Sequence, residues 1–395
     1  MGFYNRISNI LVSGAKYIQH KNTDKLVNNI LEIASFEKIE QLRPNKFESV
    51  IFVTPFMFKH GGGLTSVLRI AKRLSEKGID VFFTCPVDDR CAEMVSNAKV
   101  NLSSYEANYI LWNDALKMYF DFVVTVQDTI MYYSRKLKGY QIYFVQDYEP
   151  LFNPIGDKYY LSKKAYELGE DIISLGNWNV KNIKRNSNVN HIGDIYSIDF
   201  PFEASEYPLT IRDYSHINKK KELTIAVYIK REPKRLPGIV MNLVNGLKDD
   251  LEKIGIKLNI YYFGLHKIEK PKYGINLGRI SKNEIKALYD KSDFGMVASM
   301  TNISLVPYEM IASGLPVIEF KDGSYPDFLG DDTAILLDSF SHQELTDKIV
   351  DYIGQPESLN EMCTRAKNRL INLSWDNSGK QFYDILDSVT KRNLK

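Results

Sequence analysis

SLVPYEMIASGLPVIEF, residues 304–320, has the pattern of a loop, a short helix carrying Glu309, a glycine break at Gly314 and a buried strand from Pro316 to Phe320. The N-terminus of such a helix exposes backbone N–H groups and a positive dipole end, which favour an anion such as phosphate. Glu309, expected in the opening turn, can accept two hydroxyl hydrogen bonds, as a ribose diol would offer. An ordinary αβ unit, whose glutamate only favours its own helix N-terminus, fits the same residues, so the surrounding sequence must decide.

The composition is that of a globular protein. Its 395 residues predict two or three domains, and 44% apolar with 25% charged residues argues against disorder. A net charge of +2 gives no reason to expect a nucleic-acid partner. The three cysteines show no metal-ligand spacing and the six histidines are scattered, so we expect a reduced, cytoplasmic protein. Neither a signal peptide nor an apolar run of transmembrane length is recognised.

Residues 1–47 predict a helical extension. Apolar residues recur at helical spacing from Phe3 to Ile18, and a second amphipathic segment runs from Leu26 to Ala34. We expect these helices to pack on the main body. An interfacial helix that holds the protein at the inner face of the membrane, near a lipid-borne substrate, stays open as the alternative.

A first α/β domain is predicted for residues 48–205. The strands 49–56 and 79–86 flank a glycine loop and an amphipathic helix, which is a βαβ unit. Gly62 and Gly63 would let a sugar or phosphate approach the backbone closely, although a tight turn that needs positive φ explains them too. A dinucleotide fingerprint is not favoured, because Ser66 occupies the third glycine position.

Two further buried strands, 120–129 and 140–150, both contain Gln-Asp near their ends. Strand ends of this kind face the ligand crevice of an open α/β sheet. The candidate contacts for a polyol acceptor are Asp128, Gln146, Asp147 and Tyr148. Asp147 and Glu149 also have the spacing of an acid-x-acid metal pair, a less favoured interpretation since basic residues elsewhere can neutralise a diphosphate.

Residues 200–222 predict a linker, and a second α/β domain is expected over 206–374. Its first strand, 223–229, runs directly into a basic run at the end of a buried strand. That run contains Lys230, Arg231, Lys234 and Arg235. Cations at a strand end can neutralise a diphosphate leaving group, whereas a solvated charged loop is the alternative. The succession of two α/β sheets predicts an α/β architecture of two Rossmann-like domains.

The run from LGRISKNEIKALYDKSDFGMVAS through LVPYEMIASGLPVI resembles the donor half of a GT-B glycosyltransferase of family 4. VTPF…HGGGLTSVLRIAKRLSEKGIDV resembles that family's first βαβ unit. FVQDYEPLFNPIGDKYYLSKKAYELG and PYEMIASGLPVI are similar to the bacterial rhamnosyltransferases that build S-layer and cell-wall rhamnan glycans. The likeness extends from about residue 48 to the end. It implies a deep cleft between the two domains, and a final helix, residues 375–395, that returns to the first domain.

The resemblance also implies a function. The implied reaction transfers L-rhamnose from dTDP-β-L-rhamnose to a lipid-linked oligosaccharide or rhamnan acceptor, with retention of the anomeric configuration and without an obligatory metal. Glu309 matches the ribose-binding glutamate, Lys230 and Arg235 fall near the diphosphate-binding pair, and these three are the catalytic candidates. The remaining donor-binding candidates are Gly62, Gly63, Arg231, Gly278, Ile280, Thr301, Ser304, Leu305 and Val306. Ile280 matches the position whose backbone meets the base, and Ser304, Leu305 and Val306 match the loop whose amides face phosphate.

One departure is Thr301, which stands where the family has its first glutamate, eight positions before Glu309. It is consistent with a deoxysugar donor. It also leaves open a non-catalytic sugar-binding or scaffold protein of a glycan assembly complex. A nucleotide-sugar epimerase of the same fold is a second alternative. In a retaining reaction by front-face attack no protein base is needed, whereas inversion would make Asp128 or Asp147 the candidate base.

Overall fold

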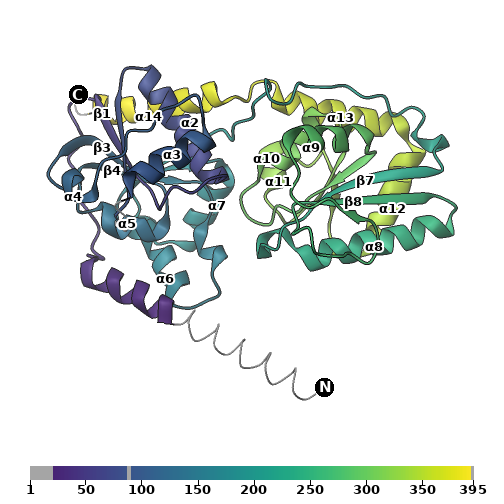
Figure 1. Ribbon diagram of the computed structural model, residues 1–395, viewed down its shortest axis with the longest axis horizontal. Coiled ribbons are helices and arrows are strands. Elements are labelled where there is room, and N and C mark those ends of the chain that lie inside the picture. The colour runs from purple at the N-terminus through teal and green to yellow at the C-terminus, as the bar shows by residue number, and fades with distance from the viewer. Residues whose placement is uncertain (1–20, 87–89, 393–395) are drawn as a thin grey trace, which may run out of the picture. The chain divides into compact units, whose positions relative to one another are not determined.

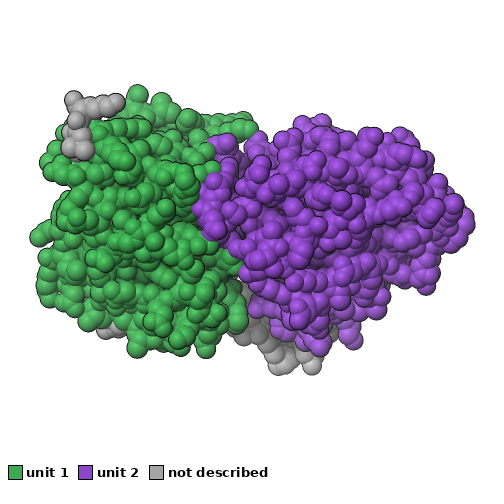
Figure 2. All heavy atoms as spheres, turned by 90° about the horizontal axis from the view of Figure 1, so that it is seen from above, with its two compact units in different colours: residues 1–175, 179–198, 379–395 green, residues 176–178, 199–378 purple. Residues whose placement is uncertain are grey.

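The computed structural model describes residues 21–86 and 90–392 (Figure 1). The chain divides into two compact units (Figure 2). Unit 1 comprises residues 1–175, 179–198 and 379–395, and unit 2 comprises residues 176–178 and 199–378. Each unit contains one six-stranded sheet. The predicted α/β class with two Rossmann-like sheets is therefore confirmed.

The sheet of unit 1 has the order β2-β1-β3-β4-β5-β6, and its strand pairs are parallel. The strands are β1 (Ser49–Val53), β2 (Asp80–Thr84), β3 (Tyr119–Thr125), β4 (Lys138–Val145), β5 (Asp171–Leu175) and β6 (Ile195–Ile198). Four of the five residues of β1 are buried, and all five of β5. Strands covered on both faces explain why the sequence shows continuous apolar runs instead of alternation.

Six helices and three 3-10 turns lie among the described residues between 62 and 191. They are α2 (Gly62–Glu76), α3 (Cys91–Asn101), α4 (Trp112–Ala115), α5 (Asp128–Ser134), α6 (Asp157–Lys164) and α7 (Asn177–Asn186), with 3-10 turns η1 (Glu149–Phe152), η2 (Ala165–Glu167) and η3 (Val189–His191). Helix α2 buries a regular apolar stripe that includes Val67, Ile70 and Leu74. That stripe is the one the sequence predicted.

The sheet of unit 2 has the order β12-β11-β10-β7-β8-β9, again with parallel pairs. The strands are β7 (Glu222–Tyr228), β8 (Lys257–Phe263), β9 (Ile275–Asn276), β10 (Phe294–Met296), β11 (Val317–Phe320) and β12 (Ile335–Leu337). In chain order this is the doubly wound 3-2-1-4-5-6 arrangement. The strand order reverses between β7 and β10, and in such sheets ligands bind beyond the carboxyl ends of the strands at that point.

Helices cover both faces of this second sheet (Figure 1). They are α8 (Pro237–Lys253), α9 (Lys282–Lys291), α10 (Leu305–Ala312), α11 (Tyr325–Leu329), α12 (His342–Gly354) and α13 (Pro356–Leu370), with 3-10 turns η4 (Ile217–Lys219) and η5 (Pro233–Arg235). One hydrophobic cluster joins α8 and α12 to the sheet, and another joins α9, α10, α11 and α13. Ser281 caps α9 in a full capping box with Glu284.

The segment predicted as a linker is largely part of unit 2. Phe202, Tyr207 and Tyr214 are 1%, 4% and 6% exposed, and they belong to the two hydrophobic clusters of unit 2. The transition between the units lies after Ile198, whereas the sequence suggested residue 205. Proline and lysine in this stretch indicated a linker, but its aromatic residues gain more by burial than they lose by ordering.

The last helix is α14 (Trp375–Lys391), which from Gly379 onward is part of unit 1. Phe382 is fully buried there, with its ring centroid 5.3 Å from that of Phe144 and 6.4 Å from that of Phe52. A Cβ added at Gly379 would lie 2.6 Å from Cγ of Arg73 on α2. The two helices therefore approach closely at this glycine.

Residues 21–33 are helical, and Ile30 in this helix is fully buried. The following segment is held by Arg135, which donates to the carbonyl of Glu37, and by Gln41, whose amide bonds to the backbone of Gln141. This part of the extension thus packs on unit 1. The predicted segment from Phe3 to Ile18 lies outside the described residues. In the part of the chain that is described, none of the helices is both long and apolar enough to cross a bilayer.

Candidate functional site

At the carboxyl edge of the second sheet, the basic run meets the loop after β10, which leads into the Glu309 segment. The loop after β10 donates the Met300 N–H to the carbonyl of Lys234, at 3.3 Å. Arg235, in η5, donates from Nη1 to the carbonyl of Ala298 at 2.8 Å and to Oγ of Ser299 at 3.4 Å. Two segments separated by more than sixty residues therefore meet at the point where the strand order reverses, where a ligand is expected.

Arg235 is the buried member of the basic run. Its residue exposure is 5%, and its Nε has no hydrogen-bond partner. A guanidinium in that position carries a charge that has been removed from water and is not fully bonded. Such a group is suited to receive an anion.

Lys230 and Arg231 have different surroundings. The Lys230 side chain is 44% exposed, with Nζ 3.8 Å from Oε1 of Glu232. Arg231 forms an ion pair with Glu269, with 2.7 Å between Nε and Oε2, and this bond lowers the pKa of that carboxyl. Both side chains are thus exposed cations, and Arg231 has the closer carboxylate partner.

Helix α10 starts at Leu305, so Leu305 and Val306, predicted as loop residues, belong to its first turn, and its N-terminus is open. Ser304 is the N-cap residue and its side chain makes no capping bond. Its Oγ is buried and has no hydrogen-bond partner. Leu305 and Val306 follow in the first turn, which contains no acidic residue. The first amides of a helix have no intrahelical acceptor, so this N-terminus offers unsatisfied donors beside an orphaned hydroxyl.

Glu309 is the fifth residue of α10, so the expectation that it lies in the opening turn is wrong. A carboxylate at the fifth position is too far along the helix to accept hydrogen bonds from the first amides. Stabilisation of its own helix N-terminus therefore does not explain Glu309. Its side chain lies among Lys282, Glu206, Tyr207 and Tyr289. Burial raises its pKa to about 7, while Lys282 opposes that shift, Glu206 adds to it, and the two phenol groups oppose it.

Tyr207 and Tyr289 are site residues that the sequence did not reveal. Tyr207 comes from the segment taken as a linker, and Tyr289 comes from α9. Lys282 pairs with Glu206 at 2.5 Å, which places one further cation near the carboxylate. In the sequence, Tyr207 is one of several aromatic residues of the 200–222 segment, and nothing local distinguishes it from the others.

Gly278 and Ile280 lie in the turn between β9 and α9. Gly278 has φ +76, which favours glycine, and its carbonyl accepts from Gly264 N at 2.8 Å. Ile280 is partly buried against the cluster that contains α9 and α10. Thr301 is 5% exposed in the loop before α10. These positions belong to the same unit as Glu309, and their contacts with a ligand remain predictions.

The glycine segment of unit 1 is helical instead of a loop. Gly62 and Gly63 open helix α2, and the N-cap Gly61 has φ −84. Positive φ occurs one position earlier, at His60, so the alternative of a positive-φ glycine turn is wrong. A Cβ added at Gly62 would meet nothing within 4 Å, whereas one added at Gly63 would lie 3.3 Å from Oε1 of Gln146. The predicted donor-side glycine and acceptor-side glutamine are therefore neighbours.

The acceptor candidates lie at the carboxyl ends of β3 and β4. Asp128 starts helix α5 instead of ending a strand, and its N–H donates to Oε2 of Glu149 at 2.6 Å. Burial raises the pKa of Asp128. Asp147 is 8% exposed, and its Oδ1 accepts from Tyr148 N at 2.9 Å. The Tyr148 ring is 1% exposed and stacks on Tyr166, so it is mainly a packing residue.

Glu149 has a structural role that the sequence does not indicate, since the sequence suggests it only as a metal ligand paired with Asp147. Burial, followed by the charge of Asp128, raises its pKa well above the usual value. Its carboxylate accepts from the hydroxyl of Tyr143 as well as from Asp128 N. A carboxylate engaged in this way ties the ends of β3 and β4 together. Within residues 21–86 and 90–392 there is no group of three or more His, Cys, Asp or Glu that could hold a metal ion.

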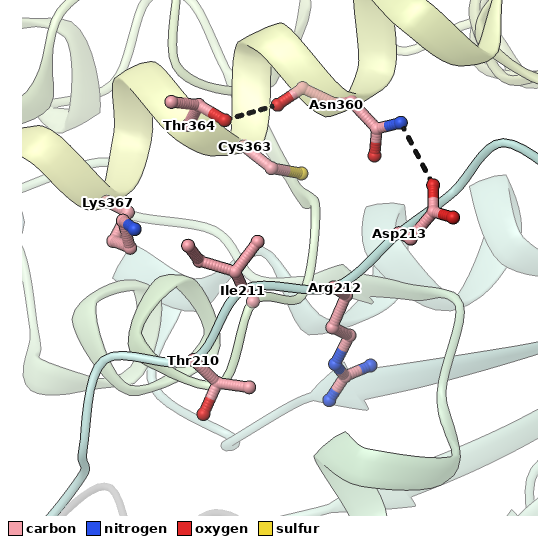
Figure 3. A pocket seen from close by; sticks show the side chains of 9 residues that line it. Thr210, Ile211, Arg212, Asp213, Asn360, Cys363, Thr364 and Lys367 are labelled. Carbon is pink, nitrogen blue, oxygen red and sulfur yellow. Dashed lines mark hydrogen bonds between the residues drawn. The ribbon is translucent and has the colours of Figure 1, made fainter.

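A cavity of about 250 Å³ lies elsewhere in unit 2, between the 210–213 segment and α13 (Figure 3). Arg212 at this cavity donates to the carbonyls of Ser292 and Tyr289, and Asn360 bonds to Asp213. The other lining residues are Thr210, Ile211, Gly314, Cys363, Thr364 and Lys367. The predicted site residues do not line it.

Residues 269–369 match the family model described as Glycosyl transferases group 1. The match includes Glu309, the N-terminus of α10, Gly278 and Thr301, and it begins after the basic run, which ends at Arg235. No curated protein matches the chain.

Solved structures match over most of the chain. HepE of Anabaena in complex with UDP is 12% identical, with a TM-score of 0.64, over 86% of this chain and 100% of that one. Sucrose-phosphate synthase from Thermosynechococcus elongatus is 12% identical, with a TM-score of 0.62, over 87% and 99%. A glycosyltransferase from Rickettsia africae is 14% identical, with a TM-score of 0.63, over 88% and 99%. The fold is GT-B. At these identities the likeness establishes the architecture, and the family match covers residues 269–369 of unit 2.

Proposed function

We propose that this protein is a retaining glycosyltransferase that binds a nucleotide sugar in unit 2. The observation that carries the proposal is the carboxyl edge at β7 and β10, where a buried Arg235 and the open N-terminus of α10 lie in one unit. The unpartnered Oγ of Ser304 and the accessible Lys230 add a donor and a second cation. The solved HepE structures contain UDP or UDP-glucose, which supports a nucleotide sugar as the ligand class.

The chemistry follows from where charge develops. As the bond between the sugar C1 and the phosphate oxygen breaks, negative charge grows on the diphosphate and the sugar becomes oxocarbenium-like. Arg235, Lys230 and the first amides of α10 would stabilise that charge without reorganisation. In a front-face reaction the acceptor oxygen bonds to C1 and its proton passes to the departing phosphate oxygen. Glu309 would hold the ribose diol. For an inverting reaction, Asp128 or Asp147 would have to take the proton instead.

We propose L-rhamnose, delivered as dTDP-β-L-rhamnose, as the transferred sugar. The support is the similarity of the 144–169 and 307–318 sequences to rhamnosyltransferases of bacterial surface glycans, together with Thr301 in place of a sugar-binding glutamate. A thermal-shift comparison of dTDP-rhamnose, UDP-glucose and GDP-mannose tests this choice, because bound ligand stabilises the folded state. A larger shift with UDP-glucose or GDP-mannose would refute rhamnose.

We propose a lipid-linked glycan as the acceptor, met at a membrane surface. Large apolar side chains are exposed in one short segment of unit 1, namely Leu151 (49%), Phe152 (48%), Ile155 (80%) and Tyr160 (60%). Residues 151–164 also contain three lysines against one aspartate. Exposed apolar groups beside cations are suited to an anionic bilayer. Flotation with anionic vesicles should be lost for Ile155→Ser with Phe152→Ser, and retained for Ile254→Ser, an exposed residue of unit 2.

Product analysis separates transfer from the two alternatives. Release of dTDP that depends on the acceptor, with a glycosylated product, supports a transferase. A changed sugar without acceptor indicates an epimerase, and binding without turnover indicates a scaffold protein. We propose that no metal is required, so turnover should persist in EDTA. Loss of turnover in EDTA with recovery by Mg²⁺ would refute that part.

A further inference from the structure

A buried carboxylate lies beneath the proposed donor site. Glu319 is on β11, between β10 and β12, and its residue exposure is 0%. Its Oε2 accepts from Ser299 N at 3.1 Å and from Phe320 N at 3.2 Å, while its Oε1 has no partner. A glutamate inside a buried strand is costly unless its charge is compensated.

The compensating charge is Arg235. Both side chains converge on Ser299, since Arg235 Nη1 lies 3.4 Å from its Oγ and Glu319 accepts from its N–H. Each retains one atom without a partner, Nε of the arginine and Oε1 of the glutamate. The two opposite charges are therefore neighbours with a serine between them and are not locked in a direct ion pair.

The other groups around the carboxylate do not provide a second cation. Burial raises the pKa of Glu319 to about 7, and the Ser299 hydroxyl, the Phe320 amide, the Arg235 charge and the Ser299 amide oppose that shift. Tyr325 on α11 faces the same region, and burial raises the pKa of its phenol, which stays neutral. Arg235 is thus the charged group among the named neighbours that favours the ionised carboxylate.

A diphosphate at this edge of the sheet would change that balance. Its negative charge would pair with Arg235, and the ionised Glu319 would then face a like charge in a dry environment. The least costly response is uptake of one proton by the carboxylate. The hydrogen bonds from Ser299 and Phe320 would still hold the loop.

We propose that Glu319 is a positioning residue that acts as the internal counter-charge of Arg235 and takes up a proton when the diphosphate of a nucleotide sugar binds. The inference rests on the proposed function and adds a proton-coupled step to donor binding. The carboxylate takes the proton from solvent when the donor binds and returns it to solvent when the diphosphate product dissociates. No further reactant is needed.

Isothermal titration with dTDP-rhamnose tests the coupling, because its esterified diphosphate does not titrate near neutral pH. Between about pH 6 and about pH 8, the wild-type Kd should rise about tenfold relative to that of Glu319→Gln, since a group with a pKa near 7 must be protonated in the complex. Titrations in two buffers of different ionisation enthalpy should show more proton uptake for the wild type. Glu361→Gln, an exposed change on α13, should behave as the wild type.

The outcomes are distinct. Parallel pH profiles for the wild type and Glu319→Gln would reduce Glu319 to a structural role and overturn the inference, while the proposed function would stand. If Glu319→Gln does not fold, wild-type binding without proton uptake overturns the inference equally. A wild-type protein that binds none of dTDP-rhamnose, UDP-glucose and GDP-mannose would refute the proposed function and with it this step.

Discussion

Glu319 should make the stability of the protein fall as the pH rises toward 8. The carboxyl has a pKa of 4.5 in the unfolded chain and about 7 in the folded one, because burial disfavours its charge. A raised carboxyl pKa means that the folded state binds more protons between these values. The contribution of Glu319 to the free energy of unfolding is therefore fully present below about pH 4.5, and it is lost as the pH rises through about 7.

The size of the effect follows from the two pKa values. Integration of the linkage relation from about pH 5 to about pH 8 gives a loss of about 2 to 3 kcal/mol of unfolding free energy, at 1.36 kcal/mol per pKa unit. Glu319→Gln removes the titration. The difference between wild type and variant should thus change by that amount over this range, whatever the absolute cost of the substitution.

Urea unfolding followed by tyrosine and tryptophan fluorescence measures the difference at each pH. Glu361→Gln provides the matched control, since its carboxylate is exposed and the wild-type pH dependence should remain. A difference between the wild type and Glu319→Gln that stays constant within about 0.5 kcal/mol would refute the reasoning. It would mean that Arg235 keeps Glu319 ionised throughout.

Three further predictions concern the donor site and the last helix. Glu309→Gln should weaken dTDP-rhamnose binding about tenfold or more above pH 7, where the wild-type carboxylate is ionised and can accept hydrogen bonds from the sugar hydroxyls of the nucleotide, and should have a smaller effect below pH 7. Equal weakening at every pH would contradict the role of Glu309 in holding the nucleotide. Phe382→Ala should cost about 3 to 5 kcal/mol of unfolding free energy, because the ring is fully buried between Phe52 and Phe144, and urea unfolding measures it. Gly379→Ala should cost about 1 to 3 kcal/mol, because its Cβ would lie 2.6 Å from Cγ of Arg73, whereas Gly354→Ala, with nothing within 4 Å, should be neutral or slightly stabilising by thermal unfolding.

Most strands of both sheets were predictable because the strands of parallel sheets are covered on both faces. The resulting continuous apolar runs, such as those at β1, β5 and β7, are recognisable without a structure. The cap of α9 was predictable for a similar reason, since a capping box is a contact between neighbours in the chain.

Errors arose where local signals competed with packing. The glycines at 61–63 suggested a loop, yet two of them begin α2, because a helix N-terminus tolerates glycine and the positive φ falls on His60. The proline and lysine residues of the 200–222 segment suggested a linker, yet Tyr207 packs beside Glu309. Asp128 was placed at a strand end but starts a helix.

The sequence by itself determined the α/β class, the two successive sheets and the position of the α10 segment, because these depend on hydrophobic periodicity and on residues close in the chain. Only the tertiary structure decided the surroundings of the charged groups. Arg235 and Glu319 are far apart in sequence and meet through Ser299 because β10 lies between β7 and β11 in the sheet. Burial and charge pairing of that kind depend on strand order, and no local pattern encodes it.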